Sequence, residues 1–298
     1  MTMDRANDTS LRGALVDFLI ERGFVSEQAV INALMAVPRH HFVGSTSVDA
    51  YEDRPLPIKE TNGEVISTIS QPSIVAHMLE TLQVSSGQRI LEIGTGLGYN
   101  AALLSHLTGP NGLVVSIEFD AELAARASGN LSHYNNVVVV HGDGRRGNAA
   151  FAPFDRIIAT AKASDIYPGW QEQLALDGLL LVPFEYHPGL TRLLRLQRTD
   201  GGFHGKFGWS VNFVPMAGEK SGEEVEVGAI KRFLARGDLR NNNVDDFLFF
   251  YYWRGAQPEA ALQEWRQLAS PPVDAFNVST KSGLLSRNYP SITLGLSI

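Results

Sequence analysis

The sequence predicts an α/β fold with a mainly parallel central sheet and helices on both of its faces. Short apolar runs recur between residues 89 and 182, and longer segments, several with helical spacing, separate them. Strands that are buried on both faces of a sheet form continuous runs of Val, Ile and Leu. Their alternation with helices is typical of parallel sheets, because a crossover must connect consecutive parallel strands.

The composition is that of a large globular protein. The 298 residues predict one large domain or one domain with a smaller module. The 25 Lys and Arg against 32 Asp and Glu give a net charge of −7, which argues against a broad nucleic-acid or anionic-membrane surface. Without cysteine, disulfides, thiol catalysis and zinc ribbons are excluded, and we predict no metal site. We find no membrane span or signal core, so we expect a cytoplasmic location.

Two short helices are predicted ahead of the sheet. Apolar residues recur with helical spacing over residues 11–35, with a break at Gly23. Ser26 stands where the second helix needs an N-cap. Pro38 ends this pattern, and residues 53–64 are rich in proline and charge, so we expect a loop there.

The predicted sheet then follows in chain order. We expect strands at residues 89–93, 113–117, 137–140, 156–159 and 179–182, with helices at 100–107 and 121–131. Two more strands, at 191–196 and 209–213, have no long helix between them. They are therefore expected to pair antiparallel at the edge of the sheet.

The composition changes after Met216. Residues 217–226 are small and acidic and indicate a linker, residues 246–253 are dense in aromatic side chains, and residues 258–268 have helical spacing. A last strand is expected at 292–296. We therefore divide the chain into a domain at residues 1–218, which includes the N-terminal helices, and a C-terminal α+β extension at residues 219–298.

A glycine loop follows the first strand of the predicted sheet. Glycines at this place let a ligand approach the backbone closely, and the following helix offers its positive N-terminus. A dinucleotide site would need glycine where Tyr99 stands. The spacing instead favours S-adenosylmethionine, which has no pyrophosphate to bind. The predicted cofactor-binding residues of this loop are Glu92, Gly94, Thr95, Gly96, Gly98 and Tyr99.

Further candidates for cofactor binding follow the next strands. Glu118 ends the second strand and could accept hydrogen bonds from both ribose hydroxyls, while Asp143, followed by Gly144, could accept from an adenine amino group. Thr160 follows the fourth strand. Because the carboxyl ends of parallel strands share one edge, we expect these residues to meet the glycine loop there. In the alternative interpretation the loop is an ordinary turn and the acids are helix N-terminal charges.

On these residues the sequence resembles the protein-L-isoaspartate O-methyltransferase family, from residue 11 to about residue 218. The stretches that carry the resemblance are VPRHHFV (37–43), AYEDRPLPI (50–58), TISQP (68–72), LEIGTGLGY (91–99), GDG (142–144), PFD (153–155) and FVP (213–215). The resemblance implies a class I S-adenosylmethionine-dependent methyltransferase fold, Rossmann-like. It also implies methyl transfer to an aspartyl or isoaspartyl carboxylate of a peptide or protein.

The resemblance also implies catalytic residues. In the family, the serine of the Ser-Gln-Pro stretch contacts the substrate carboxylate, and here that residue is Ser70, with Thr68 as a second candidate. An ionised carboxylate needs no general base, so the absence of a His, Cys and Asp constellation is expected. The alternative role for Ser70 is the N-cap of a helix over residues 74–82.

Two departures from the family bear on the substrate. The segment between Ile58 and Thr68 is longer and more charged than the usual link, and 80 residues (298 − 218) follow Gly218. In both features the sequence resembles a divergent branch of the family, which acts on ribosomally made peptides such as lanthipeptides, graspetides and lasso peptides. There an aspartate is methylated and then closes to aspartimide or isoaspartate.

We therefore expect a precursor peptide as substrate, recognised in part by the C-terminal extension. The alternative is a general repair enzyme that methylates L-isoaspartyl residues of damaged proteins. A tRNA methyltransferase fits the negative charge poorly, and a non-catalytic S-adenosylmethionine-binding protein would keep Ser70 and the acids without use.

Overall fold

The computed structural model describes residues 2–43, 47–187, 190–200 and 202–218, all of which belong to one compact unit. The predicted C-terminal extension lies outside the described residues, as do the aromatic segment at 246–253 and the helix and strand expected after it. In the described part of the chain, no helix has both the length and the apolar composition needed to cross a membrane.

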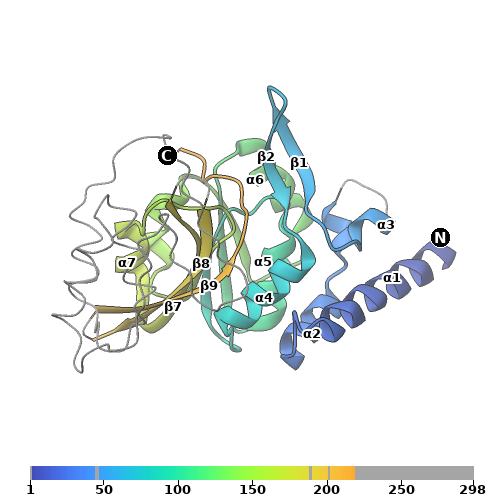
Figure 1. The fold of residues 1–298 in the computed structure, drawn as a ribbon, viewed down its shortest axis with the longest axis horizontal. Helices are drawn as coiled ribbons and strands as arrows, with labels where there is room; N and C mark the ends of the chain where they lie inside the picture. Colours follow the sequence, from blue (N-terminus) through green and yellow to red (C-terminus); the bar gives the residue numbers. More distant parts are fainter. Residues whose placement is uncertain (1, 44–46, 188–189, 201, 219–298) are drawn as a thin grey trace, which may run out of the picture. The chain divides into compact units, whose positions relative to one another are not determined.

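A mixed sheet forms the centre of the described fold (Figure 1). Its order is β5-β4-β3-β6-β7-β8-β9, in which β3 to β7 are parallel and both the β7–β8 and β8–β9 pairs are antiparallel. Its strands are β3 Arg89–Ile93, β4 Leu113–Glu118, β5 Val137–His141, β6 Phe154–Ala159, β7 Leu174–His187, β8 Leu190–Thr199 and β9 Gly202–Ser210. The α/β prediction is confirmed, and so is the antiparallel edge. The last strand lies earlier than the expected 209–213.

The order of this sheet reverses beside β3. The chain runs from β3 outward to β4 and β5, and then returns to place β6 on the other side of β3. In open α/β sheets, ligands bind outside the carboxyl ends of the strands at such a reversal. The loops that follow β3 and β6 therefore flank the position at which a cofactor is expected.

Helices cover the sheet and form an outer N-terminal layer. They are α1 Thr2–Glu21, α2 Gln28–Ala36, α3 Ser47–Ala50, α4 Pro72–Leu82, α5 Tyr99–Thr108, α6 Ala121–Asn130 and α7 Pro168–Gln173, with short 3-10 turns η1 Arg39–Phe42, η2 Gly144–Arg146 and η3 Ala149–Phe151. α5 and α6 contact the sheet, whereas α2 contacts α4 and α5. The break near Gly23 is confirmed, because α1 ends at Glu21 and α2 begins at Gln28.

The predicted N-cap of α2 is wrong. The residue at the cap position is Glu27, and its side chain makes no capping hydrogen bond. The carboxylate of Glu80, on α4, instead accepts hydrogen bonds from the backbone N–H groups of Ser26 and Glu27. A charged acceptor on a neighbouring helix thus takes the role that sequence spacing assigned to the Ser26 hydroxyl.

The expected loop at residues 53–64 is also wrong over most of its length. β1 Leu56–Thr61 and β2 Glu64–Ile69 form an antiparallel hairpin, which stands out beyond the central sheet in Figure 1. Asn62 and Gly63 join the strands with φ angles of 53° and 81°. Asn-Gly is the dipeptide that tight hairpin turns favour, because both residues tolerate the left-handed region. The loop was predicted because proline and charged residues surround this Asn-Gly pair.

A buried arginine fixes the chain between the outer layer and the hairpin. The side chain of Arg39, in η1, is fully buried and donates hydrogen bonds to the backbone carbonyls of Ala50 and Ser70, each at 2.9 Å. Its guanidinium also lies over the Tyr99 ring, 5.2 Å from the centroid. Burial lowers the pKa of Arg39. One side chain thereby connects η1, α3 and the segment that carries the predicted catalytic serine.

Replacing Arg39 by leucine is expected to destabilise the protein by about 2–4 kcal/mol, because two buried carbonyls lose their donor. The free energy of unfolding in urea would measure this change. Arg54→Leu is the matched control, since Arg54 is exposed and pairs only with carboxylates at the surface. The control should stay within about 0.5 kcal/mol of the parent protein. Equal losses in both variants would contradict the role given to Arg39.

Candidate functional site

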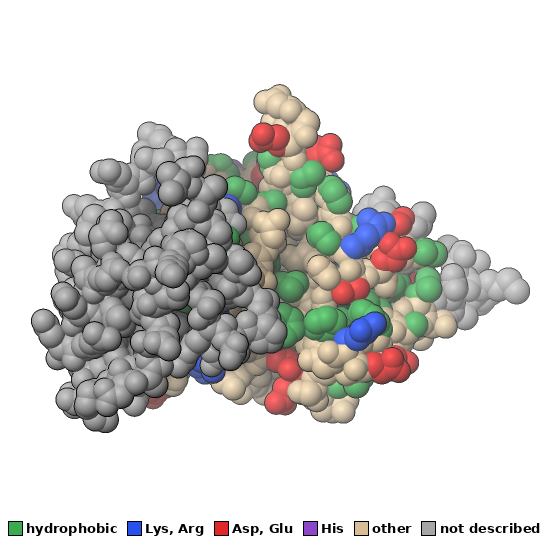
Figure 2. Space-filling view, in the orientation of Figure 1, with side chains coloured by type: hydrophobic (Ala, Val, Ile, Leu, Met, Phe, Trp, Pro, Cys, Tyr) green, Lys and Arg blue, Asp and Glu red, His purple; other side chains and the backbone are tan. Residues whose placement is uncertain are grey.

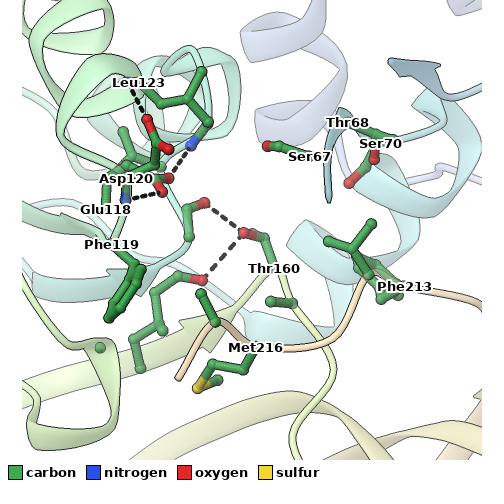
Figure 3. Close-up of a pocket in the computed structure, with 18 of the residues that line it drawn as sticks. Ser67, Thr68, Ser70, Glu118, Phe119, Asp120, Leu123, Thr160, Phe213 and Met216 are labelled. Atoms are coloured by element: carbon green, nitrogen blue, oxygen red, sulfur yellow. Dashed lines mark hydrogen bonds between the residues drawn. The ribbon is translucent and has the colours of Figure 1, made fainter. Parts of the chain in front are cut away.

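A cavity of about 490 Å³ lies at the carboxyl edge of the sheet, beside the reversal of strand order. Ligand sites for small molecules usually fall between about 300 and 1,000 Å³. Figure 3 shows Ser67, Thr68 and Ser70 on one side of this cavity, and Glu118, Phe119 and Asp120 on the other. The predicted site residues that line it are Thr68, Ser70, Gly94, Thr95, Gly96, Tyr99, Glu118, Gly144 and Thr160.

The glycine loop is seated directly on the end of β6. Gly94 has φ of 94°, and a Cβ atom added there would stand 2.5 Å from the Thr160 hydroxyl oxygen. That hydroxyl donates to the Gly94 carbonyl at 2.5 Å, and the backbone N–H of Gly94 donates to the Ile117 carbonyl at 2.9 Å. The loop backbone is therefore held between β4 and β6, and any side chain at position 94 would lift it.

The carboxylate of Glu118, at the end of β4, is oriented by two backbone hydrogen bonds. Its two oxygens accept hydrogen bonds from the backbone N–H groups of Gly96 at 2.8 Å and Asp120 at 3.0 Å. Burial raises the pKa of this carboxyl, while these backbone donors oppose the rise. A carboxylate has about four lone-pair positions, so two bonds leave acceptor capacity for two further donors. Neighbouring ribose hydroxyls are such donors.

Glu92 lies beneath the loop and does not line the cavity. Its carboxylate is fully buried and accepts hydrogen bonds from the Asn100 side-chain amide at 2.8 Å and the Ser116 hydroxyl at 2.5 Å. The Ser116 hydroxyl also lies 2.6 Å from the Thr95 hydroxyl, so the acid connects β4 with the loop. Desolvation raises the pKa of Glu92 to about 7. In this structure Glu92 supports the loop from below.

Two other predicted cofactor residues lie outside the cavity lining. Arg145 holds the Asp143 carboxylate through its side chain, with contacts between 2.8 and 3.2 Å, and through its backbone N–H at 3.0 Å. This pairing lowers the pKa of Asp143. The neighbouring Gly144, which is buried, reaches the cavity instead. Gly98 is the N-cap residue of α5 and packs against Leu131.

The predicted catalytic residues come from the end of β2. Thr68 belongs to this strand, and Ser70 follows it directly before α4. Ser70 is not the N-cap of α4, because Gln71 holds that position and the backbone N–H of Ser73 donates to the Asp53 carboxylate at 2.8 Å. The alternative role for Ser70 is therefore wrong, and its side chain lines the cavity.

Several apolar residues that line this cavity were not predicted from the sequence. Phe119 is 48% exposed at the cavity, directly after Glu118, and Leu123 follows on α6. Phe213 and Met216 lie on the segment after β9, which crosses the cavity in Figure 3. Backbone hydrogen bonds of 2.9 Å join Val214 and Met216 to Lys162 and so fix that segment to the loop after β6. Phe119 could have been predicted to line the cavity, because it directly follows the acid at the end of β4.

Comparisons with known proteins agree with this geometry. A family model described as Protein-L-isoaspartate(D-aspartate) O-methyltransferase matches residues 10–221. A protein-L-isoaspartate O-methyltransferase of Ignicoccus hospitalis is 40% identical over 209 residues, which cover 69% of this chain and 97% of that relative. The enzyme of the same name from Gloeobacter violaceus is 41% identical over 212 residues and is covered completely, with 70% of this chain.

Solved structures give the same result for the fold. A protein-L-isoaspartate O-methyltransferase superposes with a TM-score of 0.65 at 32% identity, covering 70% of this chain and 66% of that one. A beta-aspartate methyltransferase of Plasmodium falciparum, solved with S-adenosyl-L-homocysteine, has a TM-score of 0.60 at 22% identity and covers 69% of this chain and 98% of that chain. The predicted class I methyltransferase fold is confirmed.

The buried Glu92 predicts a pH-dependent stability. Between about pH 4.5 and pH 7 the unfolded chain loses the Glu92 proton while the folded protein keeps it. The unfolded state then binds fewer protons, so stability falls as pH rises through this window and levels off above it. A shift of this size corresponds to about 3 kcal/mol.

Glu92→Gln should remove this dependence. Free energies of unfolding for the parent and the variant, measured from pH 5 to pH 8, should differ increasingly in favour of the variant until about pH 7. Glu172→Gln, at an exposed acid on α7, is the control for general effects of charge. A constant difference between parent and Glu92→Gln across the window would show that Glu92 is ionised throughout.

Proposed function

Because the chain belongs to the protein-L-isoaspartate(D-aspartate) O-methyltransferase family, we propose that it methylates the carboxylate of L-isoaspartyl residues in proteins, using S-adenosylmethionine. The observation that carries the proposal is that the glycine loop and Glu118 line the same cavity as Ser70 and Thr68. The relatives support this repair function better than the peptide maturation favoured from the sequence. They give no support to a tRNA methyltransferase or a non-catalytic protein.

The residues of the cavity fit the proposed cofactor. Glu118 has acceptor capacity for the ribose hydroxyls, and the exposed ring of Phe119 beside it offers an apolar face to an adenine. The close seat of Gly94 on Thr160 leaves the loop backbone bare toward the cavity, where a methionine portion could approach. Tyr99, which is buried, adds an aromatic wall to the same cavity.

The proposed chemistry requires alignment rather than proton transfer. Bound S-adenosylmethionine supplies an electrophilic methyl group. The substrate carboxylate is already ionised at neutral pH, so the protein needs no base to activate it. The Ser70 hydroxyl can donate to one carboxylate oxygen and orient the other without neutralising it. Phe213 and Met216 add apolar walls that would exclude water from the cavity, which favours transfer to the carboxylate.

Ser70→Ala tests the substrate side of the proposal. Losing one orienting hydrogen bond is expected to lower kcat/KM for an isoaspartyl peptide about 10- to 100-fold, with little change in KM for S-adenosylmethionine. Ser132→Ala is the control for loss of a hydroxyl elsewhere, because Ser132 is exposed and is not among the residues that line the cavity. A fully active Ser70→Ala variant would contradict the assignment.

Glu118→Gln tests the cofactor side. The amide loses the charge that strengthens both ribose hydrogen bonds, so the dissociation constant for S-adenosylmethionine should rise about 10- to 100-fold in calorimetry. The comparison is Asp143→Asn, at the acid that the structure pairs with Arg145 outside the cavity. A small effect is expected there. A loss as large as that of Glu118→Gln would favour the adenine contact expected from the sequence.

Maturation of a ribosomally made peptide is the second candidate. Its support is the hairpin formed by the longer segment before Ser70, together with the residues after 221, which the family model does not match. Labelled S-adenosylmethionine and two matched peptides, one with aspartate and one with isoaspartate, separate the candidates. Labelling of isoaspartate alone supports repair. Labelling confined to a precursor peptide, followed by net loss of water, supports maturation.

A further inference from the structure

We propose that Asp53 is a positioning residue for methyl transfer, which holds the chain directly after Ser70 so that the Ser70 hydroxyl meets the substrate carboxylate. This inference rests on the proposed function, because it takes Ser70 as the contact to that carboxylate. Asp53 is not among the residues that line the cavity, whereas Ser70 is. Asp53 therefore acts on the reaction through the position of Ser70.

The carboxylate of Asp53 caps α4 from outside the helix. Pro72, the first residue of α4, has no N–H group, and the two residues after Ser73 donate to the Gln71 carbonyl at 3.1 and 3.0 Å. The N–H group of Ser73 is the remaining donor of this turn, and it donates to one Asp53 oxygen at 2.8 Å. A helix N-terminus requires such an acceptor, and a negative charge is favourable there.

The second oxygen of Asp53 holds the residue next to Ser70. It accepts a hydrogen bond from the Gln71 side-chain amide at 3.0 Å. The N-cap residue of α4 is Gln71, yet its side chain makes no capping hydrogen bond within the helix. One carboxylate therefore binds both the side chain of the N-cap residue and the backbone of Ser73, and both contacts lie within three residues of Ser70.

Ser70 is also held on its other side and at its carbonyl. Ile69, which precedes it, pairs with Leu56 in the hairpin, and the Arg39 guanidinium donates to the Ser70 carbonyl at 2.9 Å. Burial lowers the pKa of Arg39, and the nearby charge of Asp53 is one of the interactions that oppose this shift. The buried cation and the Asp53 carboxylate thus stabilise each other while they hold adjacent residues of one turn.

This arrangement matters because the proposed reaction depends on alignment. A displacement of about 1 Å in a positioning group can lower a rate about 100-fold. Without Asp53, the start of α4 loses an acceptor for a buried backbone N–H, and the turn that carries Ser70 loses a fixed end. Glu118 and the glycine loop are held by other contacts, so cofactor binding should not depend on Asp53.

The test is a double-mutant cycle in the full chain with an isoaspartyl peptide. Asp53→Ala should lower kcat/KM about 10-fold, mainly through kcat, while the dissociation constant for S-adenosylmethionine stays within about twofold. In the Ser70→Ala protein the same change should cost less than about twofold, because no hydroxyl remains to be misplaced. Unfolding in urea gives the folded fraction of each variant, by which the rates are corrected.

Two further variants keep the test decisive if Asp53→Ala folds poorly. Asp53→Asn should recover most of the lost kcat, because its amide oxygen can still accept from the Ser73 N–H group. Gln71→Ala removes only one of the two contacts and leaves the bond to Ser73 in place. A loss of about 2- to 5-fold is expected for Gln71→Ala, and none in the Ser70→Ala protein.

Glu52→Ala is the matched control, because it removes the preceding carboxylate of the same segment. Figure 2 shows acidic and basic side chains next to one another on the surface near α3. The Glu52 carboxylate lies 2.6 Å from the Arg54 guanidinium, and its side chain is 53% exposed. Exposed pairs contribute little, so kcat/KM should stay within about twofold of the parent value.

The inference is overturned if Asp53→Ala lowers kcat/KM equally with and without the Ser70 hydroxyl, if Asp53→Asn recovers nothing, or if Glu52→Ala costs as much. Failure of the proposed function has a different signature, since the parent protein then methylates no isoaspartyl peptide. The same cycle, run with the aspartyl or precursor peptide that the protein does label, would then decide the role of Asp53.

Discussion

The site depends on how closely the glycine loop sits between β4 and β6. A side chain at Gly94 would collide with the Thr160 hydroxyl, and the Gly94 backbone N–H donates to the carbonyl of Ile117 on β4. This contact fixes the end of β3 at the reversal of strand order. Glu118 is oriented by a backbone N–H of the same loop, and Glu92 supports the loop from beneath. The site therefore depends on the topology of the sheet. A displaced loop would lose its contacts with Thr160, with Glu118 and with the hydrogen-bond network of Glu92.

Most of the sheet could be predicted because burial on both faces leaves a plain mark in the sequence. β3 and β4 are nearly continuous apolar runs, and the structure buries almost every residue in them. The hairpin was missed for a local reason. Asn62 and Gly63 carry the turn, but proline and charge around them resemble a loop. The N-cap of α2 could not be predicted, since its acceptor, Glu80, is distant in the chain and arrives only with tertiary packing.

The same distinction explains the site. The glycine loop, Glu118 and Ser70 are local features of strand ends, so position in the chain was enough to place them at the cavity. Whether a carboxylate faces a ligand or a neighbouring side chain is not encoded in spacing. Asp143 stands at the expected strand end, yet Arg145 two residues later holds both of its oxygens. Glu92 precedes the loop as expected, and the alternation of β3 turns it beneath the loop.

The ammonium group of Lys59, on β1, lies 2.7 Å from the Asp120 carboxylate and so joins the hairpin to the start of α6. Asp120 also accepts from the backbone N–H of Leu123 at 3.0 Å and so begins α6, and its own N–H binds Glu118. A movement of β1 that breaks the pair would therefore disturb the residue that binds Glu118, the proposed acceptor for the ribose hydroxyls. By thermodynamic linkage, if one ligand changes the affinity for a second ligand by some factor, the second changes the affinity for the first by the same factor. A change at this one ionic contact is therefore expected to alter both affinities together.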